Sequence, residues 1–454
     1  MAGTEIKPPK SAPEKALKKV VKPIQEFMHM EASGGIVLIF MAVLAMIWAN
    51  SPFRDSYFDF FHTYIKLSIG DFVLKHSLLH WINDALMVIF FFVVGLEIKR
   101  EMVIGELSTA KKAALPIFGA IGGMLVPAGI YWLLNPAGSP GASGWGIPMA
   151  TDIAFAVGIL TLLGNRVSLA LKIFLLALAI VDDLGAVMVI AIFYTESIST
   201  VALGSAAALI FLCILLNKAG VRNLLVYIIA GIFIWLFFLK SGVHATIAGV
   251  ILGLITPVQS WIDKNFFFNE VNRFADKAAK SMKEFVDNKE QAVIPHNTMR
   301  SLEELNFLAK ESVSPLDRII HALHPWVTFF IMPVFALGNA GVYLGGVDMA
   351  SVPQNPISIG VFLGLLVGKP VGIFLFAYLS VKMKISSLPQ DVNWTQLIGV
   401  GFLAAIGFTM ALFISNLALS PETLDYSKIA ILAASTVAAI IGFVMLSLST
   451  KKKA

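Results

Sequence analysis

Charge and cysteine are both scarce in this chain of 454 residues. Only 14% of the residues are charged, whereas 57% are hydrophobic, and soluble domains carry about a quarter charged residues. A water-soluble protein of this size could not bury so much apolar surface, so the composition predicts an integral membrane protein. The single cysteine, Cys213, excludes a disulfide within the chain and a metal cluster built on cysteines.

The basic residues do not indicate a nucleic-acid-binding protein. Lys and Arg number 34 against 29 Asp and Glu, which gives a formal net charge of +5. They lie in the tails and short loops, whereas a nucleic-acid-binding domain gathers its basic side chains on one face. We therefore expect the lipid bilayer, and no nucleic acid, among the partners.

Apolar runs that are long enough to cross a bilayer predict the fold. They indicate an all-α polytopic membrane protein with about twelve transmembrane helices, spans 1 to 12. The spans lie near 34–50, 79–98, 113–134, 147–163, 170–194, 199–216, 222–239, 242–257, 326–345, 357–380, 394–417 and 428–448. Around them we expect a cytoplasmic tail at 1–32, spans 1–8 within 33–257, a charged cytoplasmic insertion at 258–324, spans 9–12 within 325–448 and a basic cytoplasmic tail at 449–454.

The distribution of Lys and Arg over the loops predicts the orientation. Loops 135–146, 195–200, 341–356 and 416–427 contain neither residue, whereas most of the alternate loops are basic. Because cytoplasmic loops carry the excess of Lys and Arg, both termini are expected in the cytoplasm. An even number of spans follows, which favours twelve over eleven.

A small β-hairpin is expected at about 62–76, in the first extracytoplasmic loop. Gly70 and Asp71 separate two partly alternating segments, which is typical of a hairpin with a two-residue turn. A lone hairpin is only marginally stable in water, so we expect it to pair, for example with its copy in a second protomer. The alternative is a solvated loop.

Two neighbouring acids, Asp182 and Asp183, lie in the middle of span 5. Ionisable groups are costly at this depth and tend to mark ion pathways. Adjacent helical residues project about 100° apart, so we expect both carboxylates to border one cavity from different sides. Such a pair can hold protons or, once deprotonated, a hard monovalent cation.

Lys369 lies midway along span 10 and requires a carboxylate partner. Asp182 and Asp152 are the two candidates. Asp152 follows Pro148 and Thr151 in span 4, a pattern typical of a helix that is broken at the middle of the membrane.

Span 11 is the counterpart of span 4, because Gly401, Gly407 and Thr409 interrupt it. Spans 3–5 and 10–12 have opposite orientations, and each triplet has its interrupted member in the middle. This is the pattern of an inverted repeat with discontinuous helices 4 and 11. Charges such as Asp152 and Lys369 could neutralise the helix-dipole ends that meet at the two breaks.

At these residues the sequence resembles the NhaA family of bacterial sodium/proton antiporters. The motifs that carry the resemblance are Trp81–Met87, Gly95–Glu101, Ala150–Ala156, Leu176–Gly185, Lys240–Thr246, His324–Val327, Gly368–Pro370 and Gly407–Met410. The resemblance implies crossing broken helices and electrogenic exchange of cytoplasmic Na⁺ or Li⁺ for external H⁺, activated at alkaline pH. It also implies a transporter in the bacterial inner membrane that is not an enzyme and has no cofactor, since these ions are its substrates.

The same resemblance assigns roles to individual residues. Asp182 and Asp183 match the family's ion-binding pair, Lys369 its membrane lysine, and Asp152 with Thr151 its broken-helix site. Asp84 matches an acid near the outer end of span 2, and the hairpin resembles the one through which the family forms homodimers. The residues that match pH-responsive positions are Glu97, Lys99, Arg100, Glu101, His244, His321 and His324. One departure is Ile320, where the family pattern has an acid.

A mechanism follows from the coupled carboxylates, which titrate as a unit. If the site opens to one side at a time, competition between Na⁺ and protons for Asp182 and Asp183 produces exchange. Lys369 either carries one of the protons or only balances charge. A membrane aspartyl protease is one alternative function, but it would need its two acids on different helices, whereas Asp182 and Asp183 are neighbours on one helix. A sodium-coupled solute symporter would suit broken helices, but the sequence has no evident site for a large solute.

Overall fold

A computed structural model describes residues 33–70, 72–195, 198–221, 224–260, 266–274, 276 and 296–450. The predicted tail at 1–32, the last four residues of the chain, Asp71 and much of the predicted insertion lie outside the described residues. The described chain forms two compact units. Unit 1 comprises Met1–Leu86, Thr109–Tyr194 and Thr328–Ala454, and unit 2 comprises Met87–Ser108 and Thr195–Val327.

The described part of the chain is mostly helical, and its helices are apolar enough to span a membrane. Within it, eight helical segments meet the length and hydropathy expected of a span, or ten if each of two bent helix pairs counts as one. Two shorter apolar helices, Leu225–Ser241 and Thr246–Ile255, accompany them. The prediction of a polytopic helical membrane protein is confirmed at this level.

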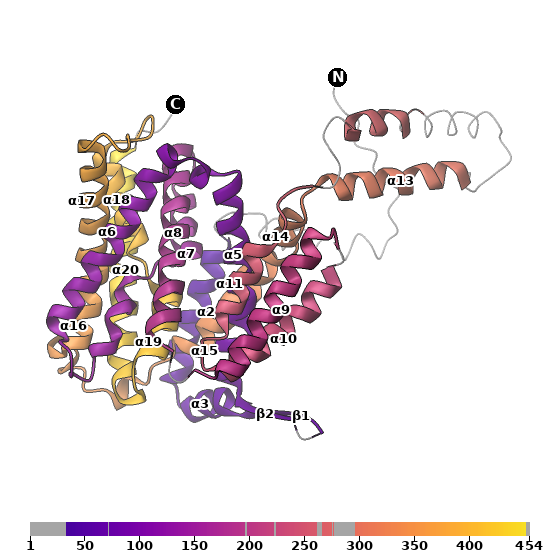
Figure 1. Ribbon diagram of the computed structural model, residues 1–454. Coiled ribbons are helices and arrows are strands. Elements are labelled where there is room, and N and C mark those ends of the chain that lie inside the picture. The colour runs from indigo at the N-terminus through magenta and orange to yellow at the C-terminus, as the bar shows by residue number, and fades with distance from the viewer. Residues whose placement is uncertain are drawn as a thin grey trace, which may run out of the picture. The chain divides into compact units, whose positions relative to one another are not determined.

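Unit 1 contains most of these segments. Its main elements are α2 (Ser33–Ala49), α3 (Arg54–His62), β1 (Tyr64–Ile69), β2 (Phe72–Ser77), α4 (Leu78–Trp81), η1 (Ile82–Leu86), α6 (Ala110–Leu134), η3 (Ala142–Met149), α7 (Ile153–Leu162), α8 (Leu169–Phe193), α15 (Met332–Asn339), α16 (Pro356–Leu363), η8 (Gly364–Gly368), α17 (Lys369–Lys382), α18 (Trp394–Ala404), α19 (Phe408–Ala418) and α20 (Pro421–Ser449). Figure 1 shows their arrangement.

Unit 2 contains α5 (Met87–Val103), α9 (Thr200–Lys218), α10 (Leu224–Ser241), α11 (Thr246–Ile255), α13 (His296–Ser312) and α14 (Pro315–Trp326). α5 packs against α11. A side chain at Gly95 would collide with the backbone of Val250, so a glycine is needed for this close approach.

The segment that corresponds to span 9 starts earlier than the sequence predicts. It runs from Pro315 to Gly346 rather than from 326 to 345. Ser314 caps the helix by accepting a hydrogen bond from Asp317 N at 3.0 Å, and Pro315 occupies the first helical turn. This start signal is local and strong, so the end of the predicted insertion is helical and continuous with the span.

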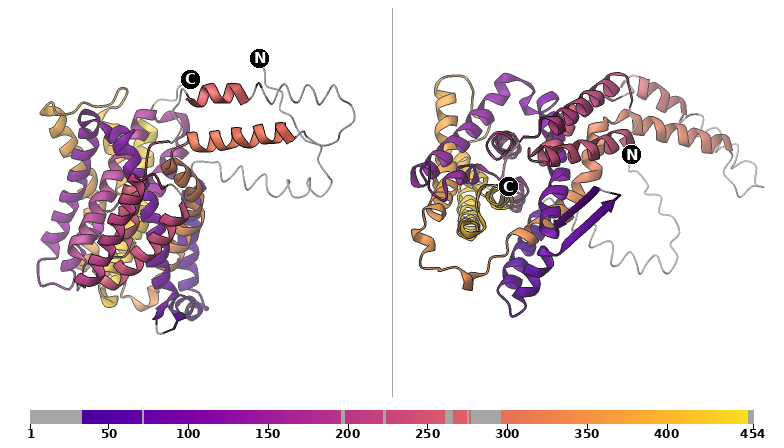
Figure 2. Two further views of the ribbon diagram at one scale, coloured as in Figure 1. Left: turned by 45° about the vertical axis from the view of Figure 1, so that its right-hand side comes forward. Right: turned by 60° about the horizontal axis from the view of Figure 1, so that its bottom comes forward.

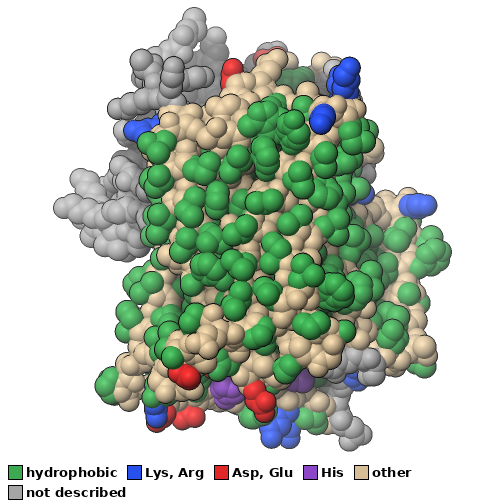
Figure 3. Space-filling model, turned by 90° about the vertical axis from the view of Figure 1, so that its left-hand side faces the viewer, with side chains coloured by type: hydrophobic (Ala, Val, Ile, Leu, Met, Phe, Trp, Pro, Cys, Tyr) green, Lys and Arg blue, Asp and Glu red, His purple; other side chains and the backbone are tan. Residues whose placement is uncertain are grey.

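The surface of unit 1 is apolar across its middle. Figure 3 shows hydrophobic side chains covering the middle of the face that carries α6, α16 and α17, with charged side chains toward the two ends. Exposed apolar residues on these helices include Leu125, Leu133 and Val371. Such a face would be unstable in water and is suited to the hydrocarbon core of a bilayer.

α6 packs along α17 and fixes the position of Lys369 at the start of α17. The two helices approach so closely that a side chain at Gly122 would collide with the carbonyl oxygen of Gly372. The π-helical turn η8 directly precedes Lys369. Turns of this kind re-aim the side chains that follow them and are frequent at functional sites.

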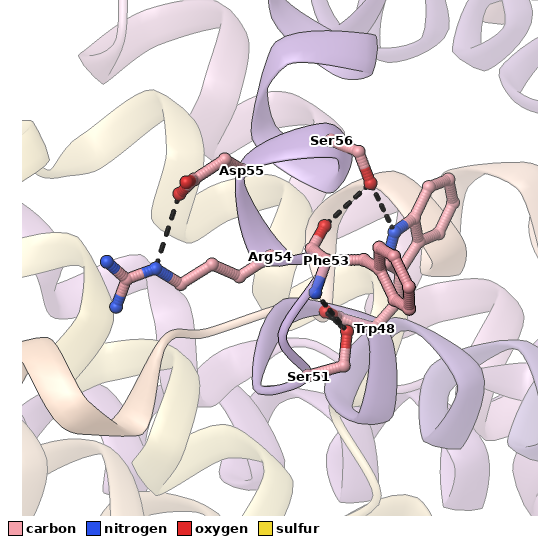
Figure 4. A network of polar contacts seen from close by, with 6 residues as sticks. All are labelled: Trp48, Ser51, Phe53, Arg54, Asp55 and Ser56. Atoms are coloured by element: carbon pink, nitrogen blue, oxygen red, sulfur yellow. Dashed lines mark hydrogen bonds and ion pairs between the residues drawn. The ribbon is translucent and has the colours of Figure 1, made fainter.

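A sharp corner joins α2 to α3, which are bent by 114°. Figure 4 shows its polar contacts: Trp48 Nε1 donates to Ser56 Oγ at 3.0 Å, and Arg54 Nε lies 3.2 Å from Asp55 Oδ1. The Arg54 guanidinium also lies over the ring of Tyr343, 4.3 Å from its centroid. These contacts tie the corner to the loop that follows α15.

β1 and β2 follow α3 and pair antiparallel, from Tyr64 opposite Ser77 to Ile69 opposite Phe72 (Figure 2). Gly70 has a φ of +57°, a left-handed conformation that glycine adopts without strain. The two strands form a two-stranded sheet.

Candidate functional site

Two apolar segments of unit 1 are interrupted, and the site is built where they meet. In the first, the 3₁₀ helix η3 ends at Met149, and α7 begins at Ile153. Ala150 and Asp152 between them have extended backbones. The sequence predicted this break at Thr151 and Asp152, but not that the first half would be a 3₁₀ helix.

The second interruption separates α18 from α19, which are bent by 47° at the break. Asp152 N donates a 2.7 Å hydrogen bond to the carbonyl oxygen of Ile406, which lies in this break. The two breaks therefore contact each other directly, and four helix ends are brought to one place.

Asp152 lies at the N-terminal ends of α7 and α19. Phe155 N donates to its Oδ1 at 3.0 Å, and Thr409 N donates to its Oδ2 at 3.2 Å. The Thr409 hydroxyl also hydrogen-bonds to Oδ2. A helix N-terminus carries unsatisfied N–H groups and a partial positive charge, so one carboxylate, which is fully buried, balances two helix ends.

The side chains of Lys369 and Thr151 lie at the C-terminal ends of η3 and α18, whereas Asp152 lies at the N-terminal ends of α7 and α19. Lys369 Nζ donates to the carbonyl oxygen of Met149 at the end of η3. The Thr151 hydroxyl lies 2.8 Å from the carbonyl oxygen of Ala404 at the end of α18. Because helix C-termini carry a partial negative charge, the ammonium group of Lys369 is electrostatically favourable here.

Asp182 joins these groups from the middle of α8. Its Oδ2 lies 2.7 Å from Lys369 Nζ, and both side chains are completely buried. The Thr151 hydroxyl lies 2.7 Å from the same oxygen. Asp183, the next residue of α8, is buried as well, with 1% of its surface exposed. Of the two carboxylates that the sequence offered to Lys369, the structure selects Asp182.

Asp84 lies on η1, near the start of predicted span 2. Its Oδ2 is 3.3 Å from Nε2 of His80, and the His80 ring stacks on His76 of β2 with ring centroids 4.1 Å apart. Burial, followed by the charge of His80, lowers the pKa of His76, whereas Asp84 acts to raise it. The sequence did not predict this contact between the hairpin and the start of span 2.

The residues that match pH-responsive positions belong to unit 2. Glu97, Lys99, Arg100 and Glu101 lie on α5, His321 and His324 on α14, and His244 directly before α11. Ile320 is buried and packs in an apolar cluster that includes Leu96 and Leu316. The position that the family pattern fills with an acid is thus part of the packing between α5 and α14.

Comparisons with known proteins agree with the geometry. The sequence profile of the family described as Na⁺/H⁺ antiporter 1 matches residues 25–446. A Na(+)/H(+) antiporter NhaA from Wolinella succinogenes is 48% identical over 431 residues, covering 94% of this chain and 93% of that protein. One from Oleidesulfovibrio alaskensis is 47% identical over 441 residues and covers 96% of both chains.

A solved structure, that of the sodium proton antiporter MjNhaP1 from Methanocaldococcus jannaschii at pH 8, covers 95% of this chain and 99% of its own, with 13% identity and a TM-score of 0.46. That likeness is too loose to support a conclusion. The family profile and the two near full-length relatives, both named NhaA, show that this chain belongs to the Na⁺/H⁺ antiporter 1 family.

Proposed function

We propose that this protein is an electrogenic secondary antiporter that exchanges cytoplasmic Na⁺ or Li⁺ for external H⁺ by alternating access, in sodium and pH homeostasis. The observation that carries the proposal is the buried pair of Asp182 and Lys369 at the crossing of two broken spans. Four ionisable side chains, those of Asp152, Asp182, Asp183 and Lys369, lie within the apolar segments. Burying them there would be too costly unless they served a function. Their chemistry suits an ion and offers nothing to an organic solute, so the symporter alternative is not supported.

The exchange begins with Asp182 and Asp183 deprotonated around a bound Na⁺. Asp182 Oδ1 has no hydrogen-bond partner among the described residues, so this oxygen is available to a cation. Carboxylate and hydroxyl oxygens are the ligands that a hard cation prefers, and Thr151 supplies a hydroxyl beside Asp182. When Na⁺ leaves, Asp183 takes up one proton and Lys369 takes up another, and the ionised Asp182 pairs again with the Lys369 ammonium group.

Asp152 has a different role in this proposal. Its contacts with the N-terminal ends of α7 and α19 hold the two breaks together while the cation enters and leaves beside Asp182. Lys369 balances the helix end at Met149 and releases a proton when a cation displaces it from Asp182.

The membrane arrangement follows from the helix count and the loop charges. Counting each bent pair as one span and adding the two shorter apolar helices supports twelve spans. The interrupted segments lie in the middle of spans 3–5 and 10–12, as an inverted repeat requires. With Lys and Arg loops inside, both termini lie in the cytoplasm and the protein lies in the bacterial inner membrane.

Assembly and regulation involve other parts of the chain. Among the described residues no further strand pairs with the β1–β2 sheet, so a second copy of the protein would cover one of its edges, which supports a homodimer through the hairpin. We assign the pH response to the charged end of α5 and the histidines of α14 and His244. The packing of Ile320 against Leu96 transmits the state of one of these helices to the other.

Everted membrane vesicles test the function. With the interior acidified by respiration, adding Na⁺ or Li⁺ should release protons from vesicles that contain the protein, whereas K⁺ should not. Vesicles that contain Asp183→Asn at the same level are the matched control and should give no response. Proton release by K⁺, or undiminished release by the Asp183→Asn protein, would contradict the proposal.

A further inference from the structure

α19 presents three residues along one side at helical spacing. Thr409, Phe413 and Asn416 stand at positions i, i+4 and i+7, which places them on one face. Thr409 holds Asp152 at the site. The other two continue toward the end of the helix, where α19 packs against α15 (Figure 1).

An aromatic contact forms the part of this packing nearer the site. The rings of Phe335 on α15 and Phe413 on α19 meet edge to face, with centroids 6.1 Å apart and planes inclined by 62°. Both side chains are completely buried. The two rings therefore form an apolar contact between α15 and α19 on this face of α19.

An amide cluster lies one turn farther from the site. Asn339 Oδ1 accepts from Asn416 Nδ2 at 2.8 Å and from Asn83 Nδ2 at 3.2 Å. Asn339 Nδ2 donates to Asn83 Oδ1 at 2.8 Å and to the carbonyl oxygen of Phe335 at 2.9 Å. The amide of Asn339, which is fully buried, therefore uses both acceptor positions and both donors.

We propose that Asn339 and Asn416, together with Phe335 and Phe413, form the gate that closes the ion site toward loops 341–356 and 416–427. The inference rests on the proposed function, which places these two loops on the extracytoplasmic side of the membrane. The aromatic pair excludes water, and the hydrogen bond between the two amides holds α15 and α19 together. External protons reach the site when this contact breaks.

The partners of α19 on its other side suggest what moves. Ser415 on α19 donates to Ser427 on α20 at 2.9 Å, and both side chains are fully buried. Phe408 N at the start of α19 donates to Ser435, also on α20. α19 and α20 therefore move together, and the separation that opens the gate takes place between α19 and α15.

Cross-linking tests the gate. Because the chain has one cysteine, the background is Cys213→Ala. The gate pair is Asn339→Cys with Asn416→Cys, and the matched control is Ser415→Cys with Ser427→Cys, which joins α19 to α20. After oxidation, exchange in everted vesicles should fall to background for the gate pair and recover on reduction, whereas the control pair should keep exchanging.

The reduced proteins separate the two proposals. Na⁺-dependent proton release by both reduced pairs verifies the proposed function independently of the gate. If the oxidised gate pair then exchanges as fast as the reduced one, the gate is wrong and the antiport stands. Loss of exchange by the oxidised control pair would also contradict the gate, because α19 and α20 are proposed to move as one body.

A second measurement does not depend on cysteines at the two asparagines. In the Cys213→Ala background, Phe413→Cys is labelled from outside with a membrane-impermeant maleimide in right-side-out vesicles. Adding Asn416→Ala should raise the labelling rate about two- to tenfold, the weight of one neutral hydrogen bond. Adding Ser415→Ala should leave the rate unchanged. An unchanged rate with Asn416→Ala would overturn the proposal.

Discussion

Asp152 and Asp182 are both fully buried aspartates beside the two breaks, yet their surroundings differ in kind. Asp152 accepts hydrogen bonds on both oxygens, and two of its donors are backbone N–H groups. Asp182 is held through one oxygen only, by the ammonium group of Lys369 and the hydroxyl of Thr151. Its other oxygen has no hydrogen-bond partner among the described residues.

On the proposed function, this difference distinguishes Asp152, which holds the two breaks together, from Asp182, which binds the transported ion. A backbone N–H is fixed in its helix, so a carboxylate that accepts hydrogen bonds from two helix ends is held in place. A lysine side chain can move away or give up its proton, and a hydroxyl can turn to another acceptor. Asp182 is thus bound by groups that can change state, as the proposed exchange requires.

Replacing each aspartate by asparagine should give the largest difference. Asp182→Asn should lower Na⁺-dependent exchange by about 100-fold or more, because removing one member of a buried hydrogen-bonded charge pair costs about 2–5 kcal/mol. Asp152→Asn should lower exchange by no more than about tenfold and should reduce the thermal unfolding midpoint, since its amide group would face N–H donors at a helix end. Proton release from everted vesicles and thermal unfolding in detergent measure the two effects.

The comparison would fail if the two variants exchanged roles. An Asp152→Asn protein that folds normally but does not exchange, beside an active Asp182→Asn protein, would make Asp152 the ion site. Asp152→Glu is a useful control, because it keeps the charge and moves the carboxylate by one methylene group. The thermal unfolding midpoint of the Asp152→Glu protein should be higher than that of the Asp152→Asn protein.

The sequence predicted the charged members of this site because charge is rare in the apolar runs. Asp182, Asp183, Asp152 and Lys369 each interrupt a run, and the cost of burying them made them visible. The sequence also predicted both breaks, from Thr151 and Asp152 and from the glycines near Gly407. It could not choose between Asp152 and Asp182 as partner of Lys369, because that choice depends on how the spans pack.

The uncharged members could not be found in the same way. The carbonyl oxygens of Met149 and Ala404 belong to the backbone, so no residue type reports them. Asn339 and Asn416 lie in apolar segments and are polar, but they carry no charge, so a search for ionisable groups passes over them. An asparagine within a membrane span is also costly unless it is hydrogen-bonded, so it is a usable signal in such sequences.

Lys369 offers a test of whether the partner of Asp182 changes state. An ammonium group that is displaced from its carboxylate is a buried, unpaired charge, which is costly in free energy. Loss of a proton removes the charge and with it this cost. If Lys369 releases a proton in this way, Lys369→Ala should exchange several-fold more slowly and without generating a membrane potential. A potential-sensitive dye in proteoliposomes, read together with internal pH, measures both quantities.

Lys369→Arg is the matched control, since arginine keeps its charge in proteins and cannot release the proton. It should be less active than Lys369→Ala although it preserves the ion pair. A membrane potential generated by the Lys369→Ala protein would show instead that Lys369 only balances charge.

The two threonines give the smallest and most specific contrast. Thr151 contacts Asp182 at 2.7 Å, whereas Thr409 contacts Asp152, and both are fully buried. Thr151→Val should raise the Na⁺ concentration for half-maximal exchange about two- to tenfold, because it removes one hydroxyl from the cation site, while Thr151→Ser should not. Thr409→Val should leave that concentration unchanged and lower the unfolding midpoint, because it weakens only the structural carboxylate. Equal shifts in the half-maximal Na⁺ concentration for the two valine variants would mean that both aspartates contact the cation.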